Sequence, residues 1–336
     1  MIQSKFNRLF IIANPTHFLN VKNYIDKYSE GNNYVILTIT YFDGYEEFLT
    51  SVKNEDRLNI LKIFFVDQNK KGLEYYIDIW KKLFTVRNIR KQHQFFDEIC
   101  FTNYKSWLQN LLFNQFRTDK LIIISDGTAI FDIVALRKKD RIIPLAGNKF
   151  FIEKVFKIKP INNLHFYSPV DIEVAPYDSL EVFKFKASKT AKINSKKIYV
   201  IGGPLVEAKY LKQKSNIINF RKIREEFQDS KIVYFAHRRE KAKNLKNYNL
   251  FNEIIVDSIP FENRLENENE LPGIIITYMS SILINLPQVY PQIKFYYFPL
   301  SKGDIPEGSP FHSRYFNLKN NFEMIRCENL KEFELK

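Results

Sequence analysis

Short apolar runs alternate with amphipathic segments along nearly the whole chain, and this alternation restricts the fold more than any other feature. Five runs in the first half have the length and composition of buried strands: Leu9–Ala13, Tyr34–Thr40, Lys62–Val66, Glu98–Phe101 and Leu121–Ser125. Between them, segments such as Leu73–Phe84 and Ser106–Phe116 carry apolar residues at helical spacing. Strands that are apolar on both faces and are separated by helices indicate a parallel sheet covered on both sides.

The same pattern repeats in the second half after a polar, basic break. The stretch Lys184–Lys197 is aperiodic and predicts an interdomain linker, and helices are expected over Glu207–Gln228. The later strand-like runs are Lys197–Ile201, Lys231–Ala236, Glu253–Val256, Ile274–Thr277 and Lys294–Phe298. We therefore expect two Rossmann-like α/β domains, residues 1–190 and 191–310, and a tail of residues 311–336. Because open sheets bind ligands beyond the carboxyl ends of their strands, the site is expected in a cleft between the domains.

Charge and cysteine content narrow the class of protein. The 336 residues include 51 Lys and Arg against 38 Asp and Glu, a net charge of +13, which favours nucleic acid, anionic lipid or an acidic small molecule as partner. The two cysteines, Cys100 and Cys327, form neither a disulfide framework nor a metal-ligand spacing. The N-terminus leads into a strand without a signal peptide, and no segment is apolar enough to span a bilayer. We expect a cytoplasmic protein with at most peripheral membrane contact.

An acid and a glycine, Asp126 and Gly127, directly follow the apolar run that begins at Leu121. An Asp at the end of a central strand would be partly desolvated, which raises its pKa and suits it to general-base chemistry. The pair is also typical of an ordinary strand-ending turn. Asp43 and Asp67 end strands as well, but they follow strands nearer the start of the chain and are weaker candidates for the base.

A second strand end, after the run Lys231–Ala236, carries His237 followed by Arg238, Arg239 and Glu240. A histidinium can donate a hydrogen bond or a proton to a phosphate oxygen, and arginine can reinforce such an anion site. A surface loop with a solvated charge cluster fits the pattern equally well.

Paired serines, Ser280 and Ser281, stand at a strand–turn–helix junction, where one of them is expected to cap the helix. Helix N–H groups and hydroxyls together form an anion site, although a plain N-cap serine is commoner. The loop Gly202-Gly203-Pro204 lets a ligand approach the backbone, but it lacks the spacing of a dinucleotide fingerprint and has no P-loop lysine. Glu262 could bind ribose hydroxyls or be a surface acid.

Taken in order, these motifs resemble a known group of transferases. They are similar to motifs of the bacterial lipooligosaccharide sialyltransferases of glycosyltransferase family 52 and of the related polysialic acid transferases. The motifs are Asp-Gly, Gly-Gly-Pro-Leu-Val-Glu, Tyr-Phe-Ala-His-Arg-Arg-Glu, Ile-Pro-Phe-Glu and Tyr-Met-Ser-Ser-Ile-Leu-Ile-Asn-Leu. The segment Phe10–His17 resembles that group's first strand and turn, and the resemblance extends to about Phe298. It implies the GT-B architecture, two Rossmann-like domains facing across a cleft, with a helical tail packing back on the first domain.

The resemblance also implies roles for single residues. Asp126 would be the general base for the acceptor hydroxyl, and His237 would act on the phosphate of the departing CMP. Residues expected to bind the CMP moiety of the donor are Gly202, Gly203, Pro204, Arg238, Glu262, Ser280 and Ser281. Residues expected on the acceptor side are Pro15, His17 and Gly127, although a structural histidine at position 17 fits equally well.

Two positions depart from the group's pattern, and one motif is missing. Arg238 stands where the group often has Pro, and Ser125 stands where an acid often precedes Asp-Gly. Both changes leave the catalytic groups in place but weaken any inference about donor and acceptor. The loops expected to face the cleft contain no Asp-x-Asp pair, so we expect a metal-independent enzyme without a cofactor or a metal site.

The expected reaction is inverting transfer of sialic acid, or a related legionaminic or pseudaminic acid, from a CMP-sugar donor to a glycan. The acceptor would belong to lipooligosaccharide or capsule, would be lipid-linked and would be met at the inner face of the cytoplasmic membrane, where the basic surplus suits anionic lipid. One alternative is a transferase of the same fold that uses a UDP-sugar or CMP-Kdo. Another is a basic nucleic-acid-binding protein, although no basic stripe with interleaved aromatics is present. A catalytically inactive scaffold is disfavoured because Asp126 and His237 are both present.

Overall fold

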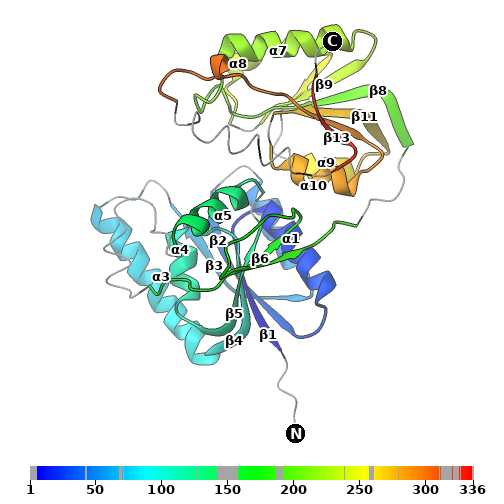
Figure 1. Ribbon diagram of the computed structural model, residues 1–336. Coiled ribbons are helices and arrows are strands. Elements are labelled where there is room, and N and C mark those ends of the chain that lie inside the picture. The colour runs from blue at the N-terminus through cyan, green and yellow to red at the C-terminus, as the bar shows by residue number, and fades with distance from the viewer. Residues whose placement is uncertain are drawn as a thin grey trace. The chain divides into compact units, whose positions relative to one another are not determined.

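The chain divides into two compact units, Met1–Phe183 and Lys184–Lys336. The computed structural model describes residues 6–41, 44–67, 70, 72–125, 127–141, 158–186, 192–237, 239–256, 261–278, 280–309, 311, 320, 325, 327 and 328–334. Each unit contains one parallel sheet with helices on its faces (Figure 1). The division falls slightly before the boundary expected at residue 190.

The first unit is built on a seven-stranded parallel sheet of order β3-β2-β1-β4-β5-β6-β7. Its strands are β1 (Asn7–Ile12), β2 (Asn32–Thr40), β3 (Leu58–Val66), β4 (Phe95–Phe101), β5 (Arg117–Ile124), β6 (His165–Ser168) and β7 (Ser179–Val182). Its helices are α1 (Pro15–Lys27), α2 (Tyr45–Lys53), α3 (Gly72–Gln92), α4 (Trp107–Phe113) and α5 (Ala129–Lys139). Right-handed crossovers put α1 on one side of the sheet and α3 and α4 on the other (Figure 1).

Burial on both faces explains why the central strands are nearly continuous apolar runs. Leu9, Phe10, Ile11 and Ile12 of β1 are all fully buried. The helix that follows starts abruptly because Asn14 accepts a hydrogen bond from the His17 N–H (3.0 Å) and Pro15 occupies the first helical position. This short β1–α1 turn places the start of α1 at the carboxyl edge of the sheet.

The second unit contains a six-stranded parallel sheet of order β10-β9-β8-β11-β12-β13, the strand order of a dinucleotide-binding Rossmann sheet. Its strands are β8 (Lys192–Ile201), β9 (Lys231–Phe235), β10 (Glu253–Ile255), β11 (Glu270–Thr277), β12 (Lys294–Tyr297) and β13 (Leu330–Glu332). Its helices are α7 (Gln213–Glu226), α8 (Ala242–Leu245), α9 (Phe261–Glu266), α10 (Ile282–Val289) and the 3₁₀ turn Lys302–Asp304. The expected pair of Rossmann-like sheets is confirmed.

The predicted linker is wrong in its last residues. Lys192–Lys197 begins β8 and pairs with the start of β11, so that Lys192 lies opposite Glu270. A bulge follows in β8, where three residues, 195–197, lie opposite Gly273 of β11, and a Cβ on Gly273 would come within 2.8 Å of the Ser195 Cα. Polar strand ends pair through their backbone, so their composition resembles that of a linker.

The described end of the tail forms a strand and not the expected helix. Leu330–Glu332 forms β13, which pairs in parallel with β12 and completes the second sheet. The Phe333 ring stacks on Phe298 with 5.2 Å between ring centres, and both belong to the second unit. These residues therefore complete the sheet of the second domain.

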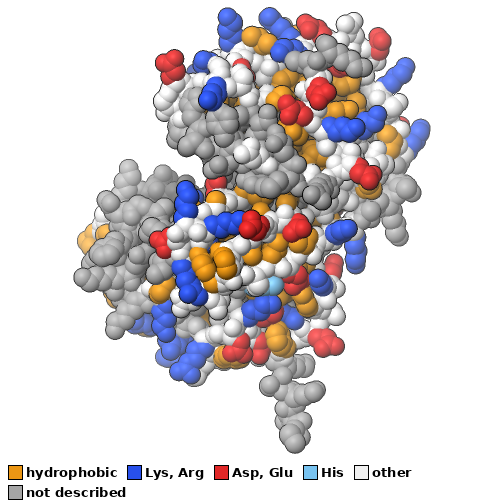
Figure 2. All heavy atoms as spheres, viewed as in Figure 1, with side chains coloured by type: hydrophobic (Ala, Val, Ile, Leu, Met, Phe, Trp, Pro, Cys, Tyr) orange, Lys and Arg blue, Asp and Glu red, His pale blue; other side chains and the backbone are white. Residues whose placement is uncertain are grey.

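Two further observations bear on partners. In the described part of the chain, no helix combines the length and the apolar character needed to cross a bilayer. On the face shown in Figure 2, Lys and Arg side chains are interspersed with Asp and Glu and form no single stripe. Such a distribution weakens the nucleic-acid interpretation of the positive charge.

Candidate functional site

The carboxyl edge of the second sheet gathers the motifs of the second half. The loop from Gly202 follows β8, His237 follows β9, and Ser280 follows β11. The ends of these strands are neighbours, since Ile201 of β8 lies opposite both Phe235 of β9 and Thr277 of β11. The order of the sheet reverses at β8, so the gap between β8 and β11 is the switch point at which such sheets bind ligands.

Glu207 ties the β8 loop to the segment after β9, and Glu240 closes the β9 loop on itself. Glu207 Oε1 accepts hydrogen bonds from the Lys241 N–H (2.9 Å) and from Asn244 Nδ2 (2.7 Å). Glu240 accepts the His237 N–H at Oε1 (2.8 Å) and the Tyr234 hydroxyl at Oε2 (2.7 Å). The glycine-loop and histidine motifs thus belong to one hydrogen-bonded unit. No role of its own was predicted for Glu240 from the sequence. Its position three residues after His237 was the signal that could have indicated a bond between the two.

The loop geometry also fixes which ring nitrogen of His237 carries the proton. The backbone N–H of Arg239 donates to His237 Nδ1 (3.1 Å). Because Nδ1 accepts, the neutral ring carries its proton on Nε2. His237 is therefore arranged to donate a hydrogen bond through Nε2.

Gly202 lies against the Glu240 carboxylate, and Gly203 does not. A Cβ on Gly202 would collide with Glu240 Oε1 and with the Tyr234 hydroxyl, whereas a Cβ on Gly203 would meet only Leu205 Cγ at 3.7 Å. The first glycine is required for the two loops to approach each other, and the second leaves the backbone open to a ligand.

Alanine at position 202 is therefore expected to destabilise the second domain by about 1–3 kcal/mol through overpacking, and to displace His237 through Glu240. Urea unfolding and a donor-hydrolysis assay measure the two effects. Gly203→Ala is the matched control and should unfold like the wild type. Equal unfolding of the two variants would contradict the packing argument.

The Glu240 carboxyl has an unusual protonation state. Burial raises its pKa from 4.5 to about 7, and nearby Glu207 acts in the same direction, while the His237 N–H and the Tyr234 hydroxyl oppose the shift. At neutral pH the carboxyl is therefore partly protonated, which reduces the negative charge beside a site expected to hold an anion.

This shift predicts a pH dependence of stability. Between pH 4.5 and about 7 the folded state keeps the Glu240 proton and the unfolded state loses it. The protonated Glu240 therefore contributes fully to the free energy of unfolding below pH 4.5. This contribution is lost as the pH rises through about 7. The total loss is about 3 kcal/mol. Urea unfolding of the wild type and of Glu240→Gln at several pH values isolates it, since the other groups titrate in both proteins. An unchanged difference between the two proteins across this range would contradict the assignment.

The serine motif has the expected position without the expected cap. Ser281 is the N-cap residue of α10, but its side chain makes no capping hydrogen bond. Ser280 and Ser281 are both partly exposed, and their carbonyls accept from Leu283 N–H (3.1 Å) and Ile284 N–H (3.0 Å). The side-chain cap was wrongly predicted, because the backbone of Ser281 is already helical (φ −59°) and its carbonyl continues the helical pattern.

Glu262 lies in the first turn of α9, after β10, and is partly exposed. Burial raises the pKa of its carboxyl, although the residue's own N–H partly offsets this. Arg238 lies outside the described residues, so its predicted contribution remains a prediction.

Asp126 also lies outside the described residues, but both of its neighbours are well defined. The buried Ser125 donates its N–H to the Tyr167 carbonyl (3.0 Å), and its own carbonyl accepts from Asn20 Nδ2 (2.8 Å). Gly127 has a left-handed backbone (φ +55°), and its carbonyl accepts from the Ile130 N–H as α5 begins. In the sequence, the predicted base therefore lies between the end of β5 and the start of α5.

Near Asp126, two buried polar atoms have no hydrogen-bond partner among the described residues: Ser125 Oγ and Asn20 Oδ1. His17 lies in the first turn of α1 and is 1% exposed. Its Nδ1 accepts the Ala13 N–H (3.1 Å) and lies 2.9 Å from Thr102 Oγ1. This burial favours the structural alternative for His17, and Pro15 begins the same helix.

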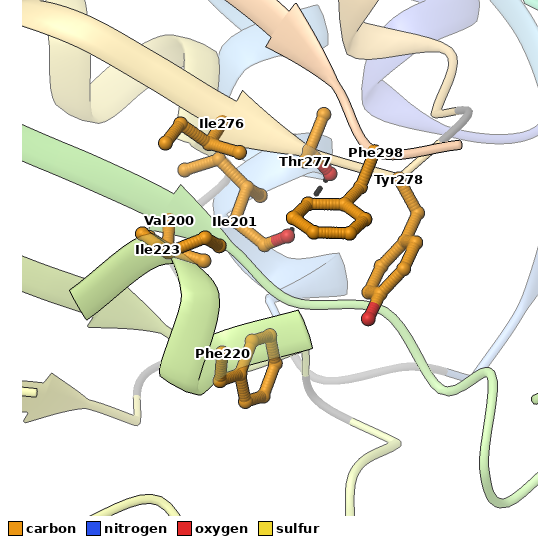
Figure 3. Close-up of a pocket in the computed structure, with 8 residues that line it drawn as sticks. All are labelled: Val200, Ile201, Phe220, Ile223, Ile276, Thr277, Tyr278 and Phe298. Carbon is orange, nitrogen blue, oxygen red and sulfur yellow. Dashed lines mark hydrogen bonds between the residues drawn. The ribbon is translucent and has the colours of Figure 1, made fainter. Parts of the chain in front are cut away.

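A small pocket lies beneath the carboxyl edge of the second sheet (Figure 3). Its walls include Ile201, Thr277, Tyr278 and Phe298, with Phe220 of α7, and its volume is about 10 Å³. Thr277 Oγ1 donates to the Ile201 carbonyl (2.9 Å) across its wall. Such a volume holds one water molecule at most, so the pocket is a packing gap of the core and not a nucleotide site. Among the residues that the structure describes, no group of three or more His, Cys, Asp or Glu side chains is placed to hold a metal ion.

Comparison with known proteins places the chain in a family. The sequence profile of the alpha-2,8-polysialyltransferase family matches residues 8–298. A comparison with curated proteins found no match. Among solved structures, Arabidopsis thaliana UGT89C1 complexed with UDP-L-rhamnose is similar at 12% identity and a TM-score of 0.54, over 98% of this chain and 85% of that chain. Phytolacca americana UGT2 complexed with UDP-2fluoro-glucose and pterostilbene is similar at 10% identity and a TM-score of 0.52, over 96% and 95%.

Likeness at such low identity shows the fold alone, and that fold is GT-B. The profile match, in contrast, extends over most of the sequence, from β1 to just beyond β12. The chain therefore belongs to the alpha-2,8-polysialyltransferase family and has the GT-B fold.

Proposed function

We propose that this protein is an inverting glycosyltransferase that moves sialic acid, or a related nonulosonic acid, from a CMP-sugar to a glycan acceptor. Family membership and the GT-B fold support a glycosyltransferase of the sialyltransferase type. The observation that carries the finer proposal is the hydrogen-bonded unit at the carboxyl edge of the second sheet. There Glu240 and Glu207 hold the His237 loop against the glycine loop, with Ser280 at the neighbouring strand end.

On the donor side, the bond between the anomeric carbon and the phosphate oxygen of CMP breaks. His237 donates from Nε2 to a phosphate oxygen as negative charge develops there, since its Nδ1 is held as an acceptor by the Arg239 N–H. Ser280, Ser281 and the N-terminus of α10 add donors to the phosphate, and Arg238 adds a positive charge. Glu262 binds the ribose hydroxyls, and the Gly202–Pro204 loop lines the nucleotide.

On the acceptor side, Asp126 takes the proton from the attacking hydroxyl as its oxygen bonds to the anomeric carbon from the opposite face. Asn20, bonded to the Ser125 carbonyl, and Gly127 hold the backbone on either side of this base. The leaving phosphate and the base act on opposite faces, so the configuration inverts. The acceptor is a glycan end of lipooligosaccharide or capsule, and the protein acts on it at the inner face of the cytoplasmic membrane.

The test is CMP release from CMP-sialic acid by the purified protein in EDTA, with and without lactose-type acceptors. Release that persists in EDTA and increases with acceptor is the expected result. Parallel reactions with CMP-Kdo and with UDP-sugars examine the alternative donors, and turnover of one of these in place of CMP-sialic acid would replace the donor assignment. If CMP-sialic acid gives no release and calorimetry detects no CMP binding, the sialyltransferase proposal is wrong.

A further inference from the structure

Helix α3 presents an apolar surface to solvent. One face is buried in the first domain through Ile79, Leu83 and Val86, and the Tyr75 ring packs against Trp107 of α4 with 5.6 Å between ring centres. The other face carries five of the twelve exposed large hydrophobic residues found in the described chain. Their exposed fractions are Leu73 75%, Tyr76 39%, Ile77 44%, Trp80 51% and Phe84 66%. Such a concentration on a single helix indicates an interaction surface.

These side chains lie in one row that ends in positive charge. Leu73, Ile77, Trp80 and Phe84 are spaced by four, three and four residues, which aligns them along one side of a helix. The same spacing continues to Arg87 and Lys91, which are both exposed. We call these six residues the α3 row: it is apolar over its first three turns and cationic at its end.

The acids of α3 itself lie away from the cationic end of the α3 row. Asp78 lies on the other side of α3, where it pairs with Lys82 and Lys70 (3.1 Å to the latter). Glu74 is in the first turn, and no acid follows Asp78 before the helix ends at Gln92. Burial of an aliphatic and aromatic row beside Lys and Arg is typical of helices that lie in the interface of an anionic bilayer.

A second copy of the chain fits the α3 row less well. In a parallel pair, Arg87 and Lys91 would face the same residues of the partner. In an antiparallel pair, they would face the apolar half of the partner's row. An anionic lipid surface accepts both halves together, since the apolar side chains enter the acyl boundary while the basic groups reach the headgroups.

We propose that the α3 row docks the first domain on the surface of a bilayer that contains anionic lipid. This inference rests on the membrane location in the proposed function and deepens it, because it names the surface that meets the bilayer. It needs neither donor nor acceptor, so its test is independent of the activity assay.

The experiment is co-sedimentation of the full-length protein with vesicles of phosphatidylcholine alone and of equal parts phosphatidylcholine and phosphatidylglycerol. Binding to the anionic vesicles that weakens with salt is expected, and Leu73→Ser/Phe84→Ser should weaken it by about tenfold or more. Arg87→Glu/Lys91→Glu should weaken it as well. Matched controls on the exposed side of α7 are Ile218→Ser and Lys214→Glu/Arg221→Glu, which should bind like the wild type.

The two tryptophans give a direct second measurement. Trp107 is 9% exposed and Trp80 is 51% exposed, so Trp107→Phe leaves Trp80 as a reporter on the α3 row. Its emission should shift to shorter wavelength with anionic vesicles and stay unchanged with phosphatidylcholine alone. Equal vesicle binding by Leu73→Ser/Phe84→Ser and the wild type would overturn the proposal. So would a concentration-dependent dimer, seen by light scattering, that this variant abolishes while vesicle binding is absent.

Discussion

Replacing His237 by alanine is expected to lower both CMP release and sugar transfer by a factor of about 10²–10⁴. The Arg239 N–H makes the His237 ring a hydrogen-bond donor at Nε2, and the Glu240 carboxylate holds the His237 backbone. The Nε2–H group is therefore positioned before the substrate binds. The loss should appear mainly in kcat, because the leaving phosphate gains most of its charge in the transition state. Lys243→Ala, an exposed change in α8, is the control and should leave the rate unchanged.

The Asp126→Ala variant tests the opposite side of the same reaction. If Asp126 takes the acceptor proton, its loss should lower acceptor-dependent transfer by a similar factor while calorimetric CMP binding stays near that of the wild type. CMP affinity and transfer that both remain unchanged would exclude Asp126 as the base. If affinity and transfer both collapse, thermal unfolding decides whether the fold of the first domain has been lost instead.

The apolar runs predicted the sheets well because parallel strands buried on both faces have few other compositions available. Ile122, Ile123 and Ile124 are at most 1% exposed, and no polar residue could replace them at low cost. Short edge strands gave a weaker signal: β6 and β7 have four residues each, and β7 is partly exposed along its length. β8 extends into the predicted linker because backbone pairing with β11 does not require apolar side chains.

The site was predictable as a set of strand ends but not as a connected unit. The order of the motifs along the chain indicated that Gly202, His237 and Ser280 meet, since each follows a strand of one parallel sheet. Glu207 bonds to residues 34 and 37 positions further along the chain, and Glu240 closes the turn that carries His237. Hydrophobic periodicity carries no information on such contacts. The missing side-chain cap at Ser281 was not predictable either, because it depends on the backbone angle of that residue.

Arg137 is a further group that the sequence did not single out, and its replacement is expected to have the largest effect on stability. Its side chain is fully buried and forms a two-pronged pair with Asp178, with Nε and Nη2 each 2.6 Å from a carboxylate oxygen. Nη1 also donates to the Tyr104 hydroxyl (3.1 Å) and to the carbonyls of Arg141 (3.0 Å) and Ile161 (3.1 Å). Arg137→Met leaves the Asp178 carboxylate buried without its cation, which should lower the free energy of unfolding by about 3–5 kcal/mol.

The neighbouring residue provides a matched comparison for urea unfolding. Lys138 pairs with Glu173 at 2.9 Å, but the Glu173 side chain is 90% exposed, so Lys138→Met should cost less than about 1 kcal/mol. The double variant Arg137→Met/Asp178→Leu removes both buried charges and should recover much of the lost free energy of unfolding. The recovery is incomplete because the carbonyls bonded to Arg137 and the Leu164 N–H bonded to Asp178 lose their partners. If Arg137→Met and Lys138→Met were equally stable, the pair would be no more than a surface ion pair. If the double variant were less stable than Arg137→Met, hydrogen bonds to the backbone, and not the unpaired carboxylate, would be the main contribution of this cluster.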